Sequence, residues 1–372
     1  MNYLFILAGE RSGDRHGAGV MEELHRLSPN LKIHGLGGGE MHALSPQVTD
    51  WVEEAGVVGI VEVLKKYGWF KQKFSETLAR IRELKPDAVV LIDYPGFNLR
   101  LAHALREGGF TGRIIYYISP QVWAWHRGRI PKMAATLDLM ICIFPFEKDL
   151  YEGYGLPTVF GGHPLVEYHR RNSSPDIPRE TNLIGLFPGS RRREITKLFP
   201  ILLETARRMK AADGSLQFAA SAASEKLAAL MRTMLEAAPV PDLTIETGTM
   251  HTLMRRAECG AVASGTATLE AAIHGLPHCL IYKVSTGTYL FARAVMRVNY
   301  LGIVNLIAKR LLVREFLQKD CSPERLCDEL LRLHRSPETR ERLVGDLKKI
   351  VDTLAADGAY HRAAQAILDT AS

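Results

Sequence analysis

Short apolar runs alternate along the chain with turns and with segments of helical spacing. The run at 3–9, YLFILAG, ends in glycine and precedes a segment in which Ala18, Met21, Leu24 and Leu27 recur at helical spacing. The same order returns at residues 87–109, 113–120, 137–155, 182–209, 217–224, 259–277 and 278–284. Apolar runs that alternate with helices of about 10–15 residues indicate buried parallel strands joined by right-handed crossovers. We therefore expect an α/β fold.

The length of 372 residues favours two domains, because a single hydrophobic core rarely grows beyond about 250–300 residues. The segment 169–182, HRRNSSPDIPRETN, is polar, contains two prolines and precedes a new strand-turn-helix series, so it is the expected boundary. We predict two doubly wound, Rossmann-like domains, 1–170 and 171–372. Ligands of such sheets bind at the carboxyl ends of the strands, so a central cleft between facing domains would receive loops from both.

Composition and charge narrow the class of protein less sharply. No stretch approaches the roughly 20 apolar residues that span a bilayer, and the first residues lack the features of a signal peptide, so we expect a cytoplasmic protein. The five cysteines are scattered singly, which favours reduced, structural thiols. The net charge of +6 suits phosphorylated ligands, nucleic acid or an anionic membrane surface, and charge alone does not choose among them.

Two glycine-rich loops follow the first strands. In LAGERSGDRHGAG (7–19) the glycine spacing differs from that of a dinucleotide-binding fingerprint. These glycines would permit close approach of a ligand, and Glu10 and Asp14 would bind its hydroxyl or amine groups. The alternative is a tight turn whose carboxylates lie near a helix start for reasons of the helix dipole. The second loop, GLGGGEMHA (35–43), is weak evidence alone.

Asp93 in LIDYPGFN (91–98) directly follows an apolar strand, and the following Pro-Gly forces a turn. A carboxylate at the carboxyl end of a buried parallel strand lies where such folds place reactive groups, and partial burial would raise its pKa toward that of a useful base. The alternative is that Asp93 only caps the turn. The agreement of strand, turn and position favours a functional role.

The segment YYISPQVWAWHRGRIPKM (116–133) places Trp123, Trp125 and His126 beside arginines after another strand. The tryptophans would stack on a sugar or line an acyl groove, or they would pin the turn in the core. For His126, and for His163 in FGGHPL, the sequence favours a structural, hydrogen-bonded histidine.

Two turns in the second half combine small residues with a helix start. In FPGSRRREI (187–195) a Gly-Ser turn points backbone N–H groups at the helix mouth, with Arg191 placed to reach inward; Arg192 and Arg193 would face solvent or pair with Glu194. In ASGTATLEAA (263–272) small residues would let a diphosphate approach the backbone, and Glu270 would accept ribose hydroxyls. Two anion-binding helix starts in one domain indicate a nucleoside diphosphate.

With these motifs, the chain resembles the lipid-A-disaccharide synthase family, inverting glycosyltransferases of family 19 with the two-domain GT-B fold. The segments that carry the resemblance run in the family's order through almost the whole chain: LAGERSGDRHGA, GLGGGEM, VVGIVEVL, IDYPGFN, YYISPQVWAW, FPFEKDLY, GGHPL, FPGSRRREI, SGTATLEAA, IYKVSTGTY and REFLQKDCSPERL. The resemblance implies transfer of 2,3-diacylglucosamine from UDP to 2,3-diacylglucosamine 1-phosphate, which gives UDP and a β-1,6-linked lipid A disaccharide 1-phosphate. It further implies peripheral association with the inner membrane, a possible homodimer and no nucleic acid partner.

The resemblance also implies roles for individual residues. Asp93 would be the catalytic base for the acceptor 6-hydroxyl, and Arg191 would stabilise the leaving group. The residues implied to hold UDP are Gly189, Ser190, Arg191, Ser264, Gly265, Thr266, Thr268 and Glu270, with Glu315 and Gln318 near the same cleft. The residues assigned to the acceptor are Glu10, Ser12, Asp14, Asn98 and Trp123. The first domain would thus bind the acceptor and face the membrane, and the second would bind the UDP-sugar.

The expected chemistry needs no metal or cofactor, because helix N-termini and Arg191 would stabilise the charge that builds on UDP. Three alternatives share the phosphate turns: a UDP-sugar epimerase, a glycosyltransferase with a soluble acceptor, and a noncatalytic UDP-sugar-binding protein. The first two need no membrane contact, and the third has no use for Asp93.

A basic, aromatic segment, VEVLKKYGWFKQKF (61–74), offers a route to acylated substrates. Val63, Tyr67, Phe70 and Phe74 form one apolar stripe at helical spacing, with Lys65, Lys66, Lys71 and Lys73 on or beside the other faces. The pattern is typical of a helix in the membrane interface, and equally of a surface helix whose stripe packs on its own domain.

Overall fold

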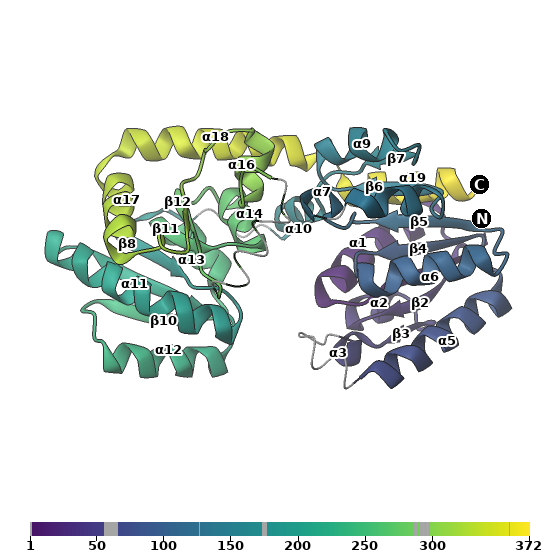
Figure 1. Cartoon of the computed structure of the whole chain (residues 1–372), viewed down its shortest axis with the longest axis horizontal. Helices are drawn as coiled ribbons and strands as arrows, with labels where there is room; N and C mark the ends of the chain where they lie inside the picture. Colours follow the sequence, from purple (N-terminus) through teal and green to yellow (C-terminus); the bar gives the residue numbers. More distant parts are fainter. Residues whose placement is uncertain are drawn as a thin grey trace. The chain divides into compact units, whose positions relative to one another are not determined.

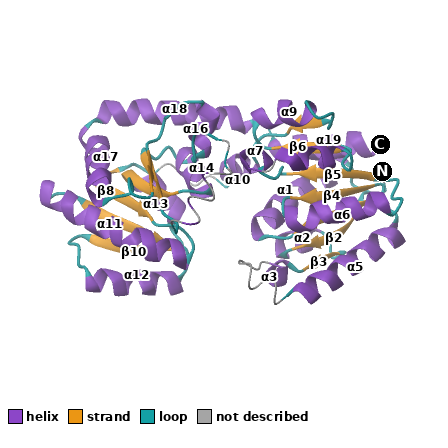
Figure 2. Cartoon of the chain, in the orientation of Figure 1, coloured by secondary structure: helices purple, strands orange, loops and turns teal. Residues whose placement is uncertain are grey.

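The computed structural model describes residues 2–55, 66–125, 127–172, 177–285, 298–356 and 358–372, together with positions 287, 289, 293 and 296. The chain divides into two compact units, Met1–Arg170 with Leu354–Ser372, and Arg171–Thr353. In each unit a parallel sheet lies among helices (Figures 1 and 2). The α/β fold with two Rossmann-like sheets, which the sequence predicts, is confirmed.

The first unit holds a seven-stranded parallel sheet, within the described residues, in the order β3-β2-β1-β4-β5-β6-β7. Its strands are β1 (Tyr3–Ala8), β2 (Lys32–Gly37), β3 (Val48–Asp50), β4 (Ala88–Ile92), β5 (Arg113–Tyr117), β6 (Leu139–Cys142) and β7 (Thr158–Phe160). Its helices are α1 (Arg11–Leu27), α2 (Gly39–Leu44), α3 (Val52–Ala55), α5 (Tyr67–Leu84), α6 (Pro95–Glu107), α7 (Val122–Trp125), η1 (Arg127–Arg129), α8 (Ile130–Ala134), α9 (Pro145–Glu152), α10 (Pro164–Arg171) and α19 (Ala359–Ala371).

Successive residues of the inner strands are buried on opposite faces of this sheet. Phe5, Leu7, Val89 and Leu91 belong to one core cluster, which also contains apolar side chains of α5, α6 and α8. The intervening residues are buried as well, so the strands read as continuous apolar runs. The sheet is therefore covered on both faces, and only its strand ends can present functional groups to a ligand.

The carboxyl-terminal helix α19 belongs to the first unit, so the expectation that the second domain extends to residue 372 is wrong for 354–372. The Tyr360 hydroxyl lies 3.0 Å from Nδ1 of His16 in α1, and the Tyr360 N–H donates to Oε2 of Glu167 at 2.7 Å. Gly19 admits the same ring, because a Cβ atom on Gly19 would lie 2.7 Å from Cζ of Tyr360. Packing on α1 therefore returns the end of the chain to the first sheet.

The second unit holds a six-stranded parallel sheet, within the described residues, in the order β10-β9-β8-β11-β12-β13. Its strands are β8 (Glu180–Phe187), β9 (Gln217–Ala222), β10 (Leu243–Thr247), β11 (Ala257–Ala263), β12 (His278–Tyr282) and β13 (Glu315–Leu317). Its helices are α11 (Arg192–Ala212), α12 (Glu225–Ala237), α13 (Met250–Arg256), α14 (Thr266–Ile273), α16 (Ile303–Ala308) and α17 (Pro323–Arg335). The long helix α18 (Pro337–Ala355) follows α17 and extends two residues beyond the unit's end at Thr353.

Each sheet reverses its strand order once, and the reversal positions the candidate sites. In the first sheet β1 and β4 are neighbours, with Ala8 opposite Ile92. In the second sheet β8 and β11 are neighbours, with Phe187 opposite Val262. Helices diverge to opposite faces at such a point, which leaves a crevice outside the carboxyl ends of the two strands.

The basic, aromatic segment is described only from Lys66 onward, so Val63 and Lys65 lie outside the described residues. Phe70 and Phe74 of α5 are partly buried and pack against the core of the first unit, whereas Tyr67 is 62% exposed. The described part of the stripe therefore faces mainly its own domain. No helix among the described residues is both long and apolar enough to pass through a bilayer.

Candidate active site

The first candidate site surrounds the turns that follow β1 and β4. The two turns touch, since a Cβ atom on Gly9 would lie 2.3 Å from Cδ1 of Tyr94. Glu10 and Asp93 therefore follow neighbouring strands at the point of reversal, although they are far apart in the sequence. The sheet thus places two carboxylate residues at the edge where ligands of this fold class bind.

Asp93 has a left-handed backbone conformation, with φ at 46°. Its carbonyl oxygen accepts hydrogen bonds from Nδ2 of Asn98 at 2.8 Å and from the Tyr116 hydroxyl at 2.5 Å. Its N–H donates to the Tyr117 carbonyl oxygen at 2.9 Å. A left-handed residue other than glycine costs on the order of 1–3 kcal/mol, so these three bonds are needed to hold it. They fix the point from which the Asp93 side chain extends.

The carboxyl group of Asp93 is set up to exchange a proton near neutral pH. Its pKa is raised to about 6, chiefly by burial and also by the negative charge of Glu10, while a hydrogen bond from the Tyr94 N–H opposes the rise. At pH 7 the group is mostly ionised and still basic enough to accept a proton from a substrate hydroxyl. The environment therefore has the property that the sequence predicts for a base at this strand end.

Asp14, assigned to the acceptor by the sequence, is bonded inside the protein. Its Oδ1 accepts from the N–H groups of Gly38 at 2.7 Å and Met41 at 3.0 Å, and its Oδ2 accepts from Glu40 at 3.1 Å. The carboxylate thereby joins α1 to the second glycine-rich loop. Asp14 thus has a structural role, and its assignment to the acceptor stays a prediction. Ser12 is exposed at the start of α1.

The glycines of the first loop leave room for neighbouring side chains of the protein itself. A Cβ atom on Gly17 would lie 2.5 Å from Sδ of Met41 and 3.0 Å from Cδ1 of Ile92. Gly9 and Gly19 similarly admit the rings of Tyr94 and Tyr360. In this structure the close approach that these glycines permit serves the packing of α1, where the sequence suggested a ligand.

Asn98 and Trp123, two residues assigned to the acceptor, are buried and form hydrogen bonds inside the first unit. Asn98 is 0% exposed, and its Nδ2 also donates to the Ile92 carbonyl oxygen at 3.1 Å. Trp123 donates from Nε1 to Oε1 of the buried Glu147 at 2.8 Å, and burial raises the pKa of Glu147 to about 7. Trp125, by contrast, is 49% exposed, and His126 lies outside the described residues.

The second candidate site begins at the turn between β8 and α11. Gly189 has φ at 104°, and a Cβ atom there would lie 2.3 Å from Oε2 of Glu194. That oxygen accepts from the N–H groups of Ser190 at 3.1 Å and Arg191 at 3.2 Å, and Nη1 of Arg191 lies 3.5 Å from Oε1 of Glu194. The expected inward reach of Arg191 is not seen, because its side chain is 68% exposed and pairs with Glu194.

The turn between β11 and α14 is more open. Gly265 has φ at 138°, and a Cβ atom there would meet nothing within 4 Å. Its carbonyl oxygen accepts from the Thr268 hydroxyl at 2.8 Å, and the Ser264 N–H donates to Ile281 at 2.9 Å. Gly265 and Thr266 are exposed at the first turn of the helix, where backbone N–H groups lack partners within the helix. This turn therefore offers room for an anion.

Three other residues assigned to UDP make hydrogen bonds within the second unit. Oε1 of Glu270 lies 3.0 Å from Nε2 of His251. The Glu315 carboxylate accepts from the N–H groups of Leu301 and Gly302, both at 2.9 Å, so it fixes the start of α16. Oε1 of Gln318 accepts from the Val284 N–H at 3.1 Å.

The structure thus brings Gly189–Arg191 and 264–268 together at one strand reversal, because β8 and β11 are neighbours. Glu315 lies apart, as the first residue of β13, where its partner across the pair is Leu280. Sequence reasoning missed Glu194 as the group that occupies the turn. Its position three residues after the N-cap Arg191 is the signal of a capping box and could have revealed it.

A family model described as lipid-A-disaccharide synthetase matches residues 4–368. A curated relative, lipid-A-disaccharide synthase of Geobacter sulfurreducens, is 37% identical over 98% of this chain and 96% of its own length. Among solved structures, a putative UDP-N-acetylglucosamine 2-epimerase from Listeria monocytogenes has a TM-score of 0.66 at 12% identity, covering 98% of this chain and 94% of its own. A glycotransferase of kitacinnamycin has a TM-score of 0.59 at 13% identity, covering 99% and 98%.

The two solved structures have low sequence identity, so they show the shared two-sheet fold alone. The family model and the curated relative are matched along nearly the whole chain. From these matches, the chain belongs to the lipid-A-disaccharide synthetase family.

Proposed function

We propose that this protein transfers 2,3-diacylglucosamine from UDP to the 6-hydroxyl of 2,3-diacylglucosamine 1-phosphate, forming a β-1,6-linked disaccharide 1-phosphate and UDP. The single observation that carries the mechanism is the half-buried Asp93 carboxyl group with its pKa raised to about 6 at the strand reversal of the first sheet. Membership of the family supports the choice of substrates. A protein that only bound a UDP-sugar would have no use for such a base.

In the proposed step, the ionised Asp93 carboxylate accepts the proton of the acceptor 6-hydroxyl. The hydroxyl oxygen forms a bond to the anomeric carbon as the bond from that carbon to the UDP oxygen breaks, and the bonding electrons leave with UDP. Inversion at the anomeric carbon gives the β linkage. The reacting sugar carries positive charge in the transition state, as in glycoside hydrolysis, while negative charge grows on the diphosphate.

We assign the diphosphate to the two turns of the second unit. The starts of α11 and α14 present backbone N–H groups and the positive end of each helix dipole, and Arg191 adds a formal charge. At the α11 turn the diphosphate must displace the Glu194 carboxylate from the N–H groups of Ser190 and Arg191. A diphosphate carries more charge than one carboxylate, so Arg191 would transfer its pairing from Glu194 to the ligand.

We further propose that the first unit holds the acceptor and associates peripherally with the inner membrane on the cytoplasmic side. The support is the exposed Tyr67 at the start of α5, with the exposed Lys66 and Lys71 beside it. An aromatic ring among basic side chains is the composition that binds an anionic lipid surface. Phe70 and Phe74 contribute little to such a contact, since both pack on the domain core.

The decisive experiment is mass spectrometry of the product formed from synthetic UDP-2,3-diacylglucosamine and 2,3-diacylglucosamine 1-phosphate. The proposal predicts a disaccharide 1-phosphate with four acyl chains and one equivalent of UDP. Incubation with the donor alone is the control, because an epimerase would change the donor without any acceptor. UDP release with a soluble sugar acceptor and none with the acylated acceptor would contradict the proposal.

A further inference from the structure

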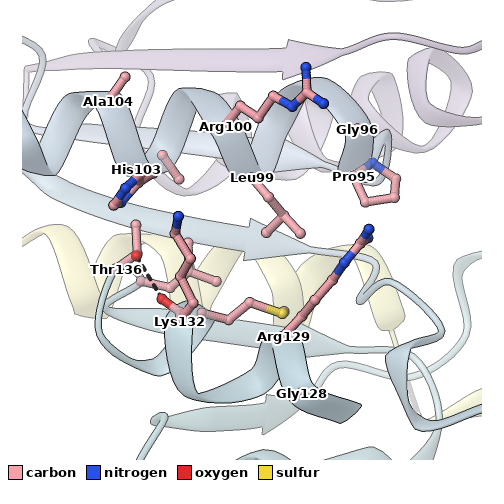
Figure 3. Close-up of a pocket in the computed structure, with 13 residues that line it drawn as sticks. Pro95, Gly96, Leu99, Arg100, His103, Ala104, Gly128, Arg129, Lys132 and Thr136 are labelled. Carbon is pink, nitrogen blue, oxygen red and sulfur yellow. Dashed lines mark hydrogen bonds between the residues drawn. The ribbon is translucent and has the colours of Figure 1, made fainter. Parts of the chain in front are cut away.

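A hollow of about 400 Å³ lies in the first unit between α6 and the segment that runs from η1 through α8 (Figure 3). Residues between Pro95 and Ala104 form one wall, and residues between Gly128 and Leu137 form the other. Pro95 follows Asp93 by two residues, so the hollow begins close in the chain to the candidate base. It continues along α6 for about 14 Å, at a rise of 1.5 Å per residue.

The walls of this hollow are cationic. In Figure 3 the side chains of Arg129 and Lys132 extend from one wall toward α6, while the guanidinium of Arg100 is turned away. Among the described residues, no ion pair or hydrogen bond engages the charged group of Arg129 or Lys132, and no acidic residue lines the hollow. Cations on one wall without a counter-charge attract an anionic ligand.

The floor of the hollow is apolar. Met133 and Leu137 are 3% and 5% exposed, and the Leu99 side chain points into the space between the two walls. A free phosphate or a plain sugar would leave the Leu99 side chain in contact with water. A phosphate that carries an acyl chain satisfies both parts, because the chain covers the apolar floor and the phosphate lies among the cations.

We infer that this hollow is the subsite for the 1-phosphate and one acyl chain of the acceptor. The phosphate binds on the wall that carries Arg129 and Lys132, whose long, exposed side chains can turn toward it, and the acyl chain lies against Leu99, Met133 and Leu137. This inference rests on the proposed function, since it takes the acylated sugar phosphate as acceptor. It places acceptor recognition on side chains that the motifs of the family resemblance do not include.

The test compares the full-length protein with the variant Arg129→Gln/Lys132→Gln. Loss of two charge-assisted contacts is expected to raise the acceptor KM by at least about tenfold, with donor KM and UDP Kd within about twofold of wild type. The matched control is Arg80→Gln/Lys148→Gln, which removes the same charge from exposed positions of the same unit. An unchanged acceptor KM in the first variant would overturn the inference.

Binding of dodecyl phosphate, measured by calorimetry below its micelle concentration, tests the hollow even if the chain transfers no sugar. The wild type should bind dodecyl phosphate at least tenfold more tightly than inorganic phosphate, and the double variant should lose that affinity. Leu99→Asn should weaken dodecyl phosphate and leave inorganic phosphate unaffected. Equal affinity for the two probes would overturn the acyl part of the site.

The same phosphate chemistry occurs in bilayer headgroups, so vesicles of phosphatidylglycerol provide a further arm. If Arg129→Gln/Lys132→Gln loses vesicle binding but keeps the wild-type acceptor KM, the hollow binds a bilayer lipid and the inference is wrong. If the variant keeps vesicle binding and loses affinity for dodecyl phosphate and acceptor together, the acceptor assignment is supported.

Discussion

The side-chain amide of Asn98 donates to the carbonyl oxygen of Asp93 at 2.8 Å, from a position with no exposure to solvent. The same nitrogen donates to the last residue of β4, Ile92, at 3.1 Å. One buried amide thus joins the end of the strand, the left-handed turn and the first turn of α6. The geometry of the candidate base depends on this bond as well as on the carboxyl group itself.

Asn98→Ala is therefore expected to lower both stability and turnover. Losing the two bonds from a buried amide should reduce the free energy of unfolding by about 1–3 kcal/mol, and a displaced Asp93 should lower kcat while donor KM stays near wild type. Urea unfolding and steady-state kinetics measure the two effects. Loss of stability with an unchanged kcat would show that Asn98 supports the fold without positioning the base.

Asp93→Asn is expected to separate activity from stability. The amide keeps the size of the side chain but accepts no proton, so kcat should fall by about 10²–10⁴ while UDP Kd changes little. Because the folded-state pKa of Asp93 is raised, its ionisation costs stability, a cost that is absent below the unfolded pKa near 4 and complete above about pH 6. At neutral pH the variant should therefore be more stable, by on the order of 2–3 kcal/mol.

Near wild-type turnover of Asp93→Asn would place the base elsewhere. The first glycine-rich loop offers Asp14 and His16, but both are less suited to the task. The Asp14 oxygens accept three backbone hydrogen bonds, and burial, with the charge of Arg15, lowers the pKa of His16 to about 3. Unchanged turnover combined with unchanged stability would contradict the raised pKa of Asp93 and its role as the base.

The pH dependence of kcat/KM should report the same carboxyl group. A base with a pKa of about 6 is lost as the pH falls through that value, so the acid limb should have its midpoint near pH 6. Glu10→Gln removes the negative neighbour and should move the midpoint to lower pH. Burial is the larger cause of the raised pKa, so most of the rise should remain.

The matched control is Glu22→Gln, which makes the same change of charge at an exposed position of the same helix. Its pH profile should coincide with that of the wild type. A midpoint that moves equally in both variants would mean that net charge, and not the Glu10–Asp93 neighbourhood, sets the profile.

At the donor turn, Arg191→Ala and Glu194→Gln are expected to change UDP affinity in opposite directions. The first removes a cation from the diphosphate and should weaken UDP binding by about 1.5–3 kcal/mol. The second removes the anion that occupies the N–H groups of Ser190 and Arg191, so it should tighten UDP binding while weakening the helix cap by about 0.5–2 kcal/mol.

Calorimetry with UDP and thermal unfolding measure these effects, with Arg193→Ala as the control for an exposed arginine on the same turn of α11. Arg193→Ala should keep the wild-type Kd. If neither Glu194→Gln nor any other condition that removes the Glu194 charge tightens UDP binding, then the diphosphate does not compete with this carboxylate.

The inner strands could be predicted from the sequence because burial on both faces leaves continuous apolar runs, as in 88–92 and 259–263. The edge strands β3, β7 and β13 have three residues each, and the five-residue β10, LTIET, is half polar, so their sequences carry little signal. The return of α19 to the first unit depends on contacts such as that between Tyr360 and His16, 344 positions apart, which no local pattern encodes.

The candidate site also has parts that the sequence predicts and parts that it does not. Asp93 and the Gly189 and Gly265 turns follow strand ends, so spacing alone locates them. The sequence cannot show that the Tyr116 hydroxyl donates to the Asp93 carbonyl oxygen, or that the buried Trp123 donates to the Glu147 carboxylate. Both hydrogen bonds arise only when neighbouring strands and helices pack.

On α5, Phe70→Ser and Lys71→Glu/Lys73→Glu are expected to affect different properties. Phe70 packs against the core of the first unit, so its replacement should lower the free energy of unfolding by about 1–3 kcal/mol. Each lysine near an anionic surface contributes roughly 1 kcal/mol, so reversal of two charges should weaken binding to anionic vesicles at least tenfold. The broken Lys73–Glu76 pair should lower the free energy of unfolding by less than about 1 kcal/mol. Urea unfolding and vesicle co-sedimentation at low and high salt measure the two outcomes.

The control for the charge reversal is Arg80→Glu/Lys85→Glu, which makes the same change at exposed positions near the other end of α5. If the membrane contact lies at the start of the helix, around Tyr67, only the Lys71/Lys73 variant should lose vesicle binding, and high salt should reduce the wild type to the same level. Equal loss in both variants would indicate attraction to net charge alone. Vesicle binding that survives the Lys71/Lys73 reversal would place the contact on another part of the protein.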